Sequence, residues 1–138
     1  MAFRTPLHVR FGDLDPAGIV YYPRFMHFCH VAMEEFFHDA IGTDYPTLLR
    51  DHGIGFPVVH LATDYHRPLR YGDNLEIEVS LPKLGRSSVT WCYRFLHSGV
   101  ERPAAESRIV TVCVAMDTFE KAPIPDWLAV LLRAHVSD

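Results

Sequence analysis

The feature that most constrains this chain is a change in the spacing of its apolar residues near Pro23. From there to Gly42, apolar side chains recur every three or four residues on one helical stripe, at Phe25, Cys29, Ala32, Met33, Phe36 and Ala40. Proline suits the first turn of a helix, and glycine suits its C-terminal exit. The spacing predicts one long helix, and the further apolar residues Phe28 and Phe37 predict that a sheet encloses it on more than one side.

Segments on both sides of this helix have the two-residue period of strands. Alternation predicts a strand at residues 7–11 before the helix, and strands at residues 75–81 and 89–95 after it. Residues 56–66 are a further candidate, and residues 109–116 are apolar on both parities, as expected of a central strand covered on both faces. Asp126 could cap a short last helix that carries Trp127, Leu128, Leu131 and Leu132. The order predicts an α+β fold with one antiparallel sheet around one helix.

Length and composition favour a single domain over residues 1–138. Hydrophobic residues make up 49% of the chain, which is enough for a packed core and excludes wholesale disorder. Thirteen Lys and Arg against 17 Asp and Glu give 13 − 17 = −4, which argues against a nucleic-acid partner. Three cysteines without a CxxC pair indicate reduced thiols. With no apolar leader and no span of membrane length, we expect a cytoplasmic protein without a membrane partner.

Two carboxylates, Asp13 and Asp15, lie in a turn-rich segment directly before the predicted helix. A helix N-terminus presents unpaired N–H groups and a partial positive charge. A carbonyl oxygen bound there would be polarised, while a nearby carboxylate could attack the carbonyl or activate water. The alternative is that both aspartates only bond turn amides, which is the commoner role of such residues.

Residues 12–23, GDLDPAGIVYYP, resemble the active-site signature of the 4-hydroxybenzoyl-CoA thioesterase family of hotdog-fold proteins. Residues 56–60 and 71–73 are similar to the second-strand entry and the following turn of that family. The resemblance implies a hotdog fold, in which a five-stranded antiparallel sheet wraps around one long helix. It also implies a homodimer joined edge to edge, and a homotetramer as a dimer of dimers.

The resemblance assigns the family's catalytic aspartate to Asp15 and its oxyanion-binding backbone N–H to Tyr22. The second assignment agrees with the residue chemistry, because Pro23 has no N–H to offer and the residue before it does. Asp13 is then interpreted as a structural residue of the turn.

Substrate-binding candidates come from two other segments. Arg86 matches one member of a phosphate-binding cluster for coenzyme A, although Gly85 and Ser87 stand where the family has cations. Lys83, Ser87 and Ser88 lie in the same predicted turn, and a solvated turn lysine is an equal alternative for Lys83. On the strand after residue 56, Val58 and His60 would border the acyl pocket across the dimer, with a packed interface histidine as the alternative for His60.

Other chemistries have weaker support in the sequence. His27, His30 and Glu34 follow one another at helical spacing, but there is no HExxH pattern, so surface histidines are favoured over a metal site. Cys29 is expected to be a buried thiol, and the absence of GxSxG disfavours a serine hydrolase. No metal or redox cofactor is implied.

The sequence therefore predicts an acyl-CoA thioesterase that releases a free acid and coenzyme A. Asp15 would act as nucleophile or as general base, and the acyl group would be aromatic, similar to 4-hydroxybenzoyl. Three alternatives stay open. They are a short-chain aliphatic acyl-CoA thioesterase, a hotdog dehydratase or hydratase, and a non-catalytic acyl-binding protein.

Overall fold

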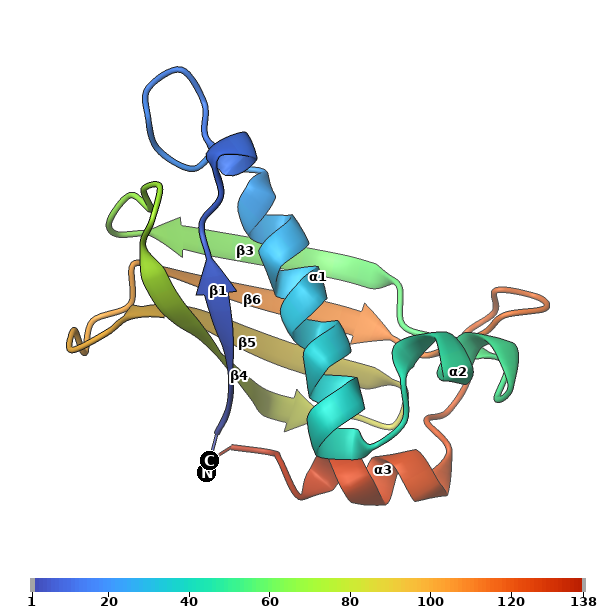
Figure 1. Cartoon of the computed structure of the whole chain (residues 1–138). Coiled ribbons are helices and arrows are strands. Elements are labelled where there is room, and N and C mark those ends of the chain that lie inside the picture. Colours follow the sequence, from blue (N-terminus) through green and yellow to red (C-terminus); the bar gives the residue numbers. More distant parts are fainter. Residues whose placement is uncertain (1, 138) are drawn as a thin grey trace.

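One long helix forms the centre of the structure, a computed structural model that describes residues 2–137 (Figure 1). Helix α1, Arg24–Phe36, continues directly into a wider π-helical turn, η2, at Phe37–Ile41. Pro23 caps the helix one position before its first turn, and Gly42 ends it with a left-handed φ of 82° that favours glycine. The helix predicted from the apolar stripe is therefore confirmed.

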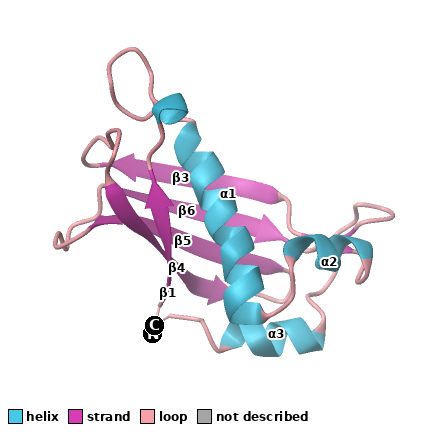
Figure 2. Ribbon diagram, viewed as in Figure 1, coloured by secondary structure: helices cyan, strands magenta, loops and turns pink. Residues whose placement is uncertain are grey.

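The sheet that packs on this helix has five antiparallel strands in the order β1-β4-β5-β6-β3 (Figure 2). The strands are β1 Phe3–His8, β3 Val58–Tyr65, β4 Asn74–Leu84, β5 Ser88–His97 and β6 Ala105–Val112. Helix α1 crosses one face of the sheet (Figure 1). This arrangement confirms the predicted α+β class and the five-stranded sheet around one helix.

The core lies between α1 and the sheet face toward it, and it is rich in aromatic residues. Phe36, Trp91 and Phe95 are fully buried. The rings of Phe36 and Trp91 meet edge to face with their centroids 5.4 Å apart, a geometry that adds to the hydrophobic gain. The strand residues that alternate with Trp91 and Phe95 point to the other face, so the two-residue period decides which side chains meet the helix.

Two predicted strands have different ends in the structure. The segment predicted at 7–11 begins earlier and ends at His8, because the Asp13 carboxylate accepts the Arg10 N–H and closes a short 3₁₀ turn, η1, at Phe11–Asp13. Phe11 is consequently 79% exposed. The segment predicted at 109–116 ends as β6 at Val112.

The continuation of that segment forms a separate small ladder that was not predicted. Strand β7, Val114–Ala115, pairs with β2, Ile54–Gly55. Within the segment, Ile109 and Thr111 are buried toward the helix, whereas Val110 and Val112 on the outer face are only partly buried, so this one chain does not cover both faces fully.

Two shorter helices and one turn also differ from the prediction. Helix α2, Tyr45–Arg50, was not predicted, and α3 spans Asp126–Arg133 with Pro125, rather than Asp126, at the capping position. Lys83 lies on β4 opposite Thr90, so the turn predicted at residues 82–88 is shorter than expected. No helix within residues 2–137 is long and apolar enough to cross a membrane.

The sheet has two ends with different surroundings. At one end, His8 pairs with Asn74 and Tyr65 pairs with Ala105. The loop that leads into α1 starts from this end. The β4–β5 turn lies at the opposite end beside α3 (Figure 1). With about 3.3 Å per strand residue, the eight residues of β3 separate these ends by roughly 25 Å.

Candidate active site

The loop between η1 and α1 is closed by its own backbone. Leu14 bridges Val20, and the Asp15 N–H donates to the Ile19 carbonyl at 2.9 Å. The Gly18 N–H donates back to the Asp15 carbonyl at 2.9 Å, and Gly18 has a φ of 81° that an L side chain would strain. These bonds hold the Asp15 backbone in one place relative to the start of α1.

The Asp15 side chain is half-buried and only partly engaged. Its Oδ1 accepts the Ala17 N–H at 2.8 Å, and within residues 2–137 its Oδ2 has no hydrogen-bond partner. One oxygen therefore orients the carboxylate while the other is free to meet a substrate or a water molecule.

The Asp13 side chain has a different environment and is buried. Its Oδ2 accepts the Arg10 N–H at 2.9 Å, and its Oδ1 accepts Nε and Nη2 of Arg24 at 3.1 and 2.6 Å. Both carboxylate oxygens are used within the chain. These contacts agree with the prediction that Asp13 is structural.

The Tyr22 N–H lies at the start of α1, directly before Pro23. The following amides, those of Arg24 and Phe25, donate to the carbonyls of Tyr21 and Tyr22. Within residues 2–137 the Tyr22 N–H itself has no acceptor. It is a free donor at the positive end of a helix, which is the geometry expected of an oxyanion site.

A cavity of about 370 Å³ opens beside this N–H. It is lined by Ile19, Val20, Tyr22 and Phe25 from the loop and helix, and by residues 65–69 after β3. Asp15 precedes the Ile19–Val20 arm of the same closed loop. The two predicted catalytic residues therefore lie on one loop. Of the two, Tyr22 lines this cavity, whereas Asp15 is not in its lining.

Arg67, which the sequence analysis missed, is fixed at the wall of this cavity. Its Nη2 lies 3.1 Å from His97 Nδ1, and His97 Nε2 lies 3.1 Å from Asp73 Oδ2. Arginine can only donate, so His97 Nδ1 accepts and its Nε2 carries the proton given to Asp73. Burial alone would raise the pKa of Asp73, but hydrogen bonds from the Arg70 N–H and His97 outweigh burial and lower it.

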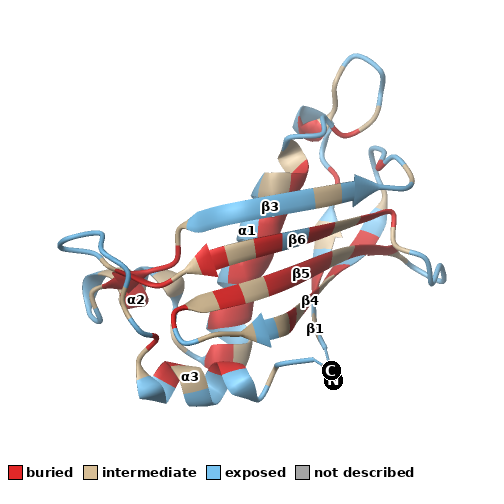
Figure 3. Cartoon of the chain, turned by 180° about the vertical axis from the view of Figure 1, so that it is seen from behind, coloured by how far each residue is buried: buried red, intermediate tan, exposed pale blue. Residues whose placement is uncertain are grey.

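The substrate-binding candidates of β3 lie on an edge strand whose side chains are almost all exposed (Figure 3). Val58 lines a second cavity between α1 and the sheet. His60 is exposed, pairs with Val110 of β6, and lies apart from Asp15 within one chain.

Three of the four coenzyme A candidates meet at the opposite end of the sheet. Arg86, Ser87 and Ser88 line a cavity of about 420 Å³ together with Lys121. Arg86 also lines a neighbouring cavity with Arg133 of α3, a cation that the sequence analysis missed. Lys83 is exposed on β4 and is not part of either lining.

The cysteines are free and buried, as predicted. Burial raises the pKa of the Cys29 thiol to about 12, which leaves it protonated and a poor nucleophile. Within residues 2–137, no three His, Cys, Asp or Glu side chains are grouped so as to hold a metal ion. His30 instead pairs with Glu34 at 2.9 Å on the helix surface.

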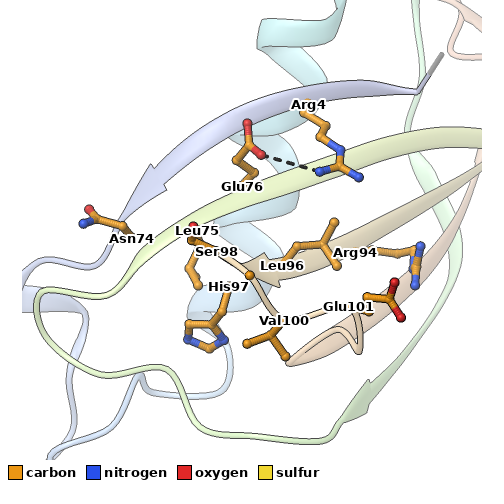
Figure 4. A pocket seen from close by; sticks show the side chains of 11 residues that line it. Arg4, Asn74, Leu75, Glu76, Arg94, Leu96, His97, Ser98, Val100 and Glu101 are labelled. Carbon is orange, nitrogen blue, oxygen red and sulfur yellow. Dashed lines mark ion pairs between the residues drawn. The ribbon is translucent and has the colours of Figure 1, made fainter.

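A larger concavity of about 770 Å³ lies over the ends of β1, β4 and β5 (Figure 4). Both of its arginines are paired with glutamates. Arg4 lies 3.6 Å from Glu76, and Arg94 lies 3.2 Å from Glu78. These ion pairs neutralise both arginines of the concavity.

A five-stranded antiparallel sheet wrapped around one long helix is the hotdog fold. A family model described as the Thioesterase-like superfamily matches residues 9–132, and the chain belongs to this family. The protein is an acyl-CoA thioesterase. Its membership of the narrower 4-hydroxybenzoyl-CoA branch stays a prediction.

Individual relatives cover nearly the whole chain. A 1,4-dihydroxy-2-naphthoyl-CoA hydrolase of Synechococcus elongatus is 35% identical over 127 residues, 88% of this chain and 91% of the relative. A thioesterase superfamily structure from Jannaschia sp. CCS1 superposes with a TM-score of 0.92 at 27% identity and covers 99% and 94% of the two chains. A gentisyl-coenzyme A thioesterase structure gives a TM-score of 0.82 at 28% identity and covers 91% and 98%.

Proposed function

We propose that this thioesterase hydrolyses a hydroxylated aromatic acyl-CoA, with 1,4-dihydroxy-2-naphthoyl-CoA as the first candidate. The observation that carries the proposal is the free Asp15 oxygen on the loop that leads to the unpaired Tyr22 N–H. The relatives whose names specify a substrate supply the acyl class, since both 1,4-dihydroxy-2-naphthoyl and gentisyl groups are hydroxylated aromatic rings. This keeps the aromatic preference predicted from sequence, and 4-hydroxybenzoyl-CoA remains within the class.

In the proposed mechanism the thioester oxygen accepts the Tyr22 N–H. As general base, Asp15 takes a proton from water while the water oxygen bonds to the acyl carbon. The tetrahedral oxyanion is stabilised at the helix N-terminus. It collapses by breaking the C–S bond, and the coenzyme A thiolate takes the proton from Asp15. As nucleophile, an Asp15 oxygen would instead bond to the acyl carbon and expel the coenzyme A thiolate, which leaves a mixed anhydride. Water then cleaves the anhydride to the free acid and the Asp15 carboxylate, and the proton released goes to the thiolate.

We further propose that a complete site needs two copies of the chain, joined along β3. This edge strand exposes apolar side chains, with Val59 60% exposed, Val58 52% and Leu61 46% (Figure 3). The other edge, β1, carries Pro6, which cannot extend a ladder freely. An open apolar edge strand favours pairing with a second copy.

Such pairing would bring together, at one substrate, the Asp15 loop and the Arg86 turn, which lie far apart within one chain. Antiparallel pairing of β3 with β3 of a second copy places the Tyr65 end of one chain beside the Val58 end of the other. The Asp15 loop of one copy then approaches the Arg86 turn of the second, although these lie at opposite ends of a single chain. Val58 and His60 would lie at this junction, as the resemblance implied. A dimer of dimers remains the expected larger assembly.

Thiol release measured on a panel of substrates tests the function. The panel contains 1,4-dihydroxy-2-naphthoyl-CoA, 4-hydroxybenzoyl-CoA, benzoyl-CoA and butyryl-CoA. We expect the highest kcat/KM on a hydroxylated aromatic thioester. A higher value on butyryl-CoA would favour the short-chain alternative. Binding without thiol release from any substrate would favour a non-catalytic acyl-binding protein.

A further inference from the structure

The second cavity, between α1 and the sheet, has no role in the chemistry above. It has a volume of about 170 Å³, and we call it the seam cavity. Its wall is mainly aromatic, aliphatic and sulfur-containing and includes Met26, Cys29, Met33, Leu61, Trp91 and Tyr93. An apolar cavity of about 150 Å³ can hold a benzene molecule. The seam cavity therefore has room for one aromatic ring.

The seam cavity follows the cavity at Tyr22 along α1 and β3, because its lining residues come next on both elements. Met26 follows Tyr22 by one helical turn, about 6 Å along the axis, and Leu61 precedes Tyr65 by four strand residues. The rings of Phe25 and Tyr65, both in the wall of the Tyr22 cavity, meet edge to face with centroids 5.0 Å apart. A ring attached to a carbonyl at Tyr22 can extend in this direction.

One polar group in the wall lacks a partner. Tyr93 lies on the helix-facing side of β5 and is only 2% exposed. Within residues 2–137 its hydroxyl makes no hydrogen bond, and no fully enclosed side-chain polar atom there lacks a partner, so this hydroxyl is accessible from the cavity. Buried tyrosine hydroxyls usually have a partner. Burial raises the pKa of Tyr93 well above its ordinary value, so the hydroxyl keeps its proton. It can therefore donate a hydrogen bond to a ligand in the cavity.

The other two hydroxyls of the wall are hydrogen-bonded within the chain. Thr111 Oγ1 accepts from Trp91 Nε1 at 2.9 Å and donates to the Val89 carbonyl at 3.4 Å. Tyr45 Oη accepts the Phe56 N–H at 3.0 Å. Thr111 therefore offers a matched contrast, because its hydroxyl lines the same cavity but is satisfied within the chain.

We propose that the seam cavity receives the ring of the acyl group and that Tyr93 Oη donates a hydrogen bond to an oxygen on that ring. Tyr93 is then a specificity-determining residue. The inference rests on the proposed function and gives a physical reason for its preference. An oxygenated ring satisfies the hydroxyl, whereas an unsubstituted ring of the same shape leaves it buried and unpaired. A second fused ring extends toward the mouth, where Val58 and Leu61 are half-exposed.

Tyr93→Phe tests this inference, because it removes the hydroxyl and keeps the ring beside Trp91. The kcat/KM is measured for 1,4-dihydroxy-2-naphthoyl-CoA against 2-naphthoyl-CoA, and for 4-hydroxybenzoyl-CoA against benzoyl-CoA. We expect the preference for the hydroxylated member of the better pair to fall about 10- to 100-fold. The Tm should stay level or rise, because no bond within the protein is lost.

The matched control is Thr111→Val, which should lower the Tm and change kcat/KM equally for both members of a pair. A preference in Tyr93→Phe within twofold of the wild-type value would overturn the inference while leaving the proposed function intact. If the wild-type enzyme hydrolysed no aromatic thioester, the proposed function itself would fail. A Tm loss in Tyr93→Phe as large as that in Thr111→Val would show a structural hydroxyl and also overturn the inference.

Discussion

Arg24 Nη2 lies 2.6 Å from Asp13 Oδ1, so the first residue of α1 is tied to the loop before it. This ion pair separates the roles of two aspartates that are only two residues apart. Asp13 is buried and neutralised by a cation, whereas Asp15 keeps one oxygen free. The ion pair fixes the start of the helix, where the Tyr22 N–H is presented, without engaging the proposed catalytic carboxylate.

Exchange of each aspartate for asparagine should separate catalysis from stability. Asp15→Asn can keep the bond to the Ala17 N–H but loses the negative charge, so kcat should fall at least ~100-fold with little change in Tm. Asp13→Asn breaks the ion pair with Arg24 and should cost roughly 1–3 kcal/mol of unfolding free energy. Steady-state kinetics and urea unfolding of both variants check this. Near-normal turnover by Asp15→Asn would refute its catalytic role.

Loss of the Arg86 cation should weaken coenzyme A binding rather than chemistry. The phosphates are bound equally in the ground and transition states, so Arg86→Ala should raise KM with little change in kcat. A rise of roughly 5- to 30-fold corresponds to about 1–2 kcal/mol for one charge-assisted contact. Lys83→Ala is the control, since Lys83 lies outside both cavities at this end, and its KM should not change. An unchanged KM in Arg86→Ala would move the phosphate site elsewhere.

Mixed dimers should show whether one site draws on two chains. Asp15→Asn and Arg86→Glu, each impaired alone, are mixed, dissociated and reassociated. A hybrid then holds one site with an intact Asp15 and an intact Arg86, so the purified hybrid should recover toward half the wild-type activity at low substrate concentration, and a randomly reassociated equal mixture toward about a quarter. Sedimentation should first show a dimer or larger assembly at micromolar concentration. No recovery by verified hybrids would place both residues of a site in one chain, and a fully active monomer would exclude the dimer.

Alkaline pH should destabilise the protein through Cys29. Burial raises the pKa of this thiol from 9.0 to about 12, so above pH 9 the unfolded chain releases a proton that the folded chain retains. Stability is therefore fully present below pH 9 and is lost as pH rises toward 12. By pH 10 the loss from this group should be about 1.4 kcal/mol. Urea unfolding with reductant at pH 7.5 and 10 should show a smaller loss for Cys29→Ala, and equal losses would contradict this account.

The sequence reveals those parts of the fold that depend on neighbours along the chain. The stripe that contains Phe25 and Phe36 specifies α1, because its period is local. The pairing of Ile54–Gly55 with Val114–Ala115 leaves no such signal, because two residues are too short to show a period and the partners are distant in sequence. Helix α2 was missed for a related reason, since its six residues bury only Leu48.

The same distinction applies to the site. Asp15 and Tyr22 share one loop, so a contiguous motif can indicate both. Arg67 is held in place by His97 and Asp73, which belong to other segments of the chain. Tyr93 can be linked to a ligand only when β5 is seen to face α1 across the seam cavity. Such residues become visible only once the tertiary structure brings them together.

The wide turn at Phe37–Ile41 makes the far end of the central helix adjustable. A π-helical turn holds one residue more than an ordinary α-helical turn. Deletion of one residue there can restore regular helical winding without shifting the register of residues 24–36. The helix can thus change length at its exit while the start that presents the Tyr22 N–H stays fixed. Natural or engineered length variation is best absorbed at this turn.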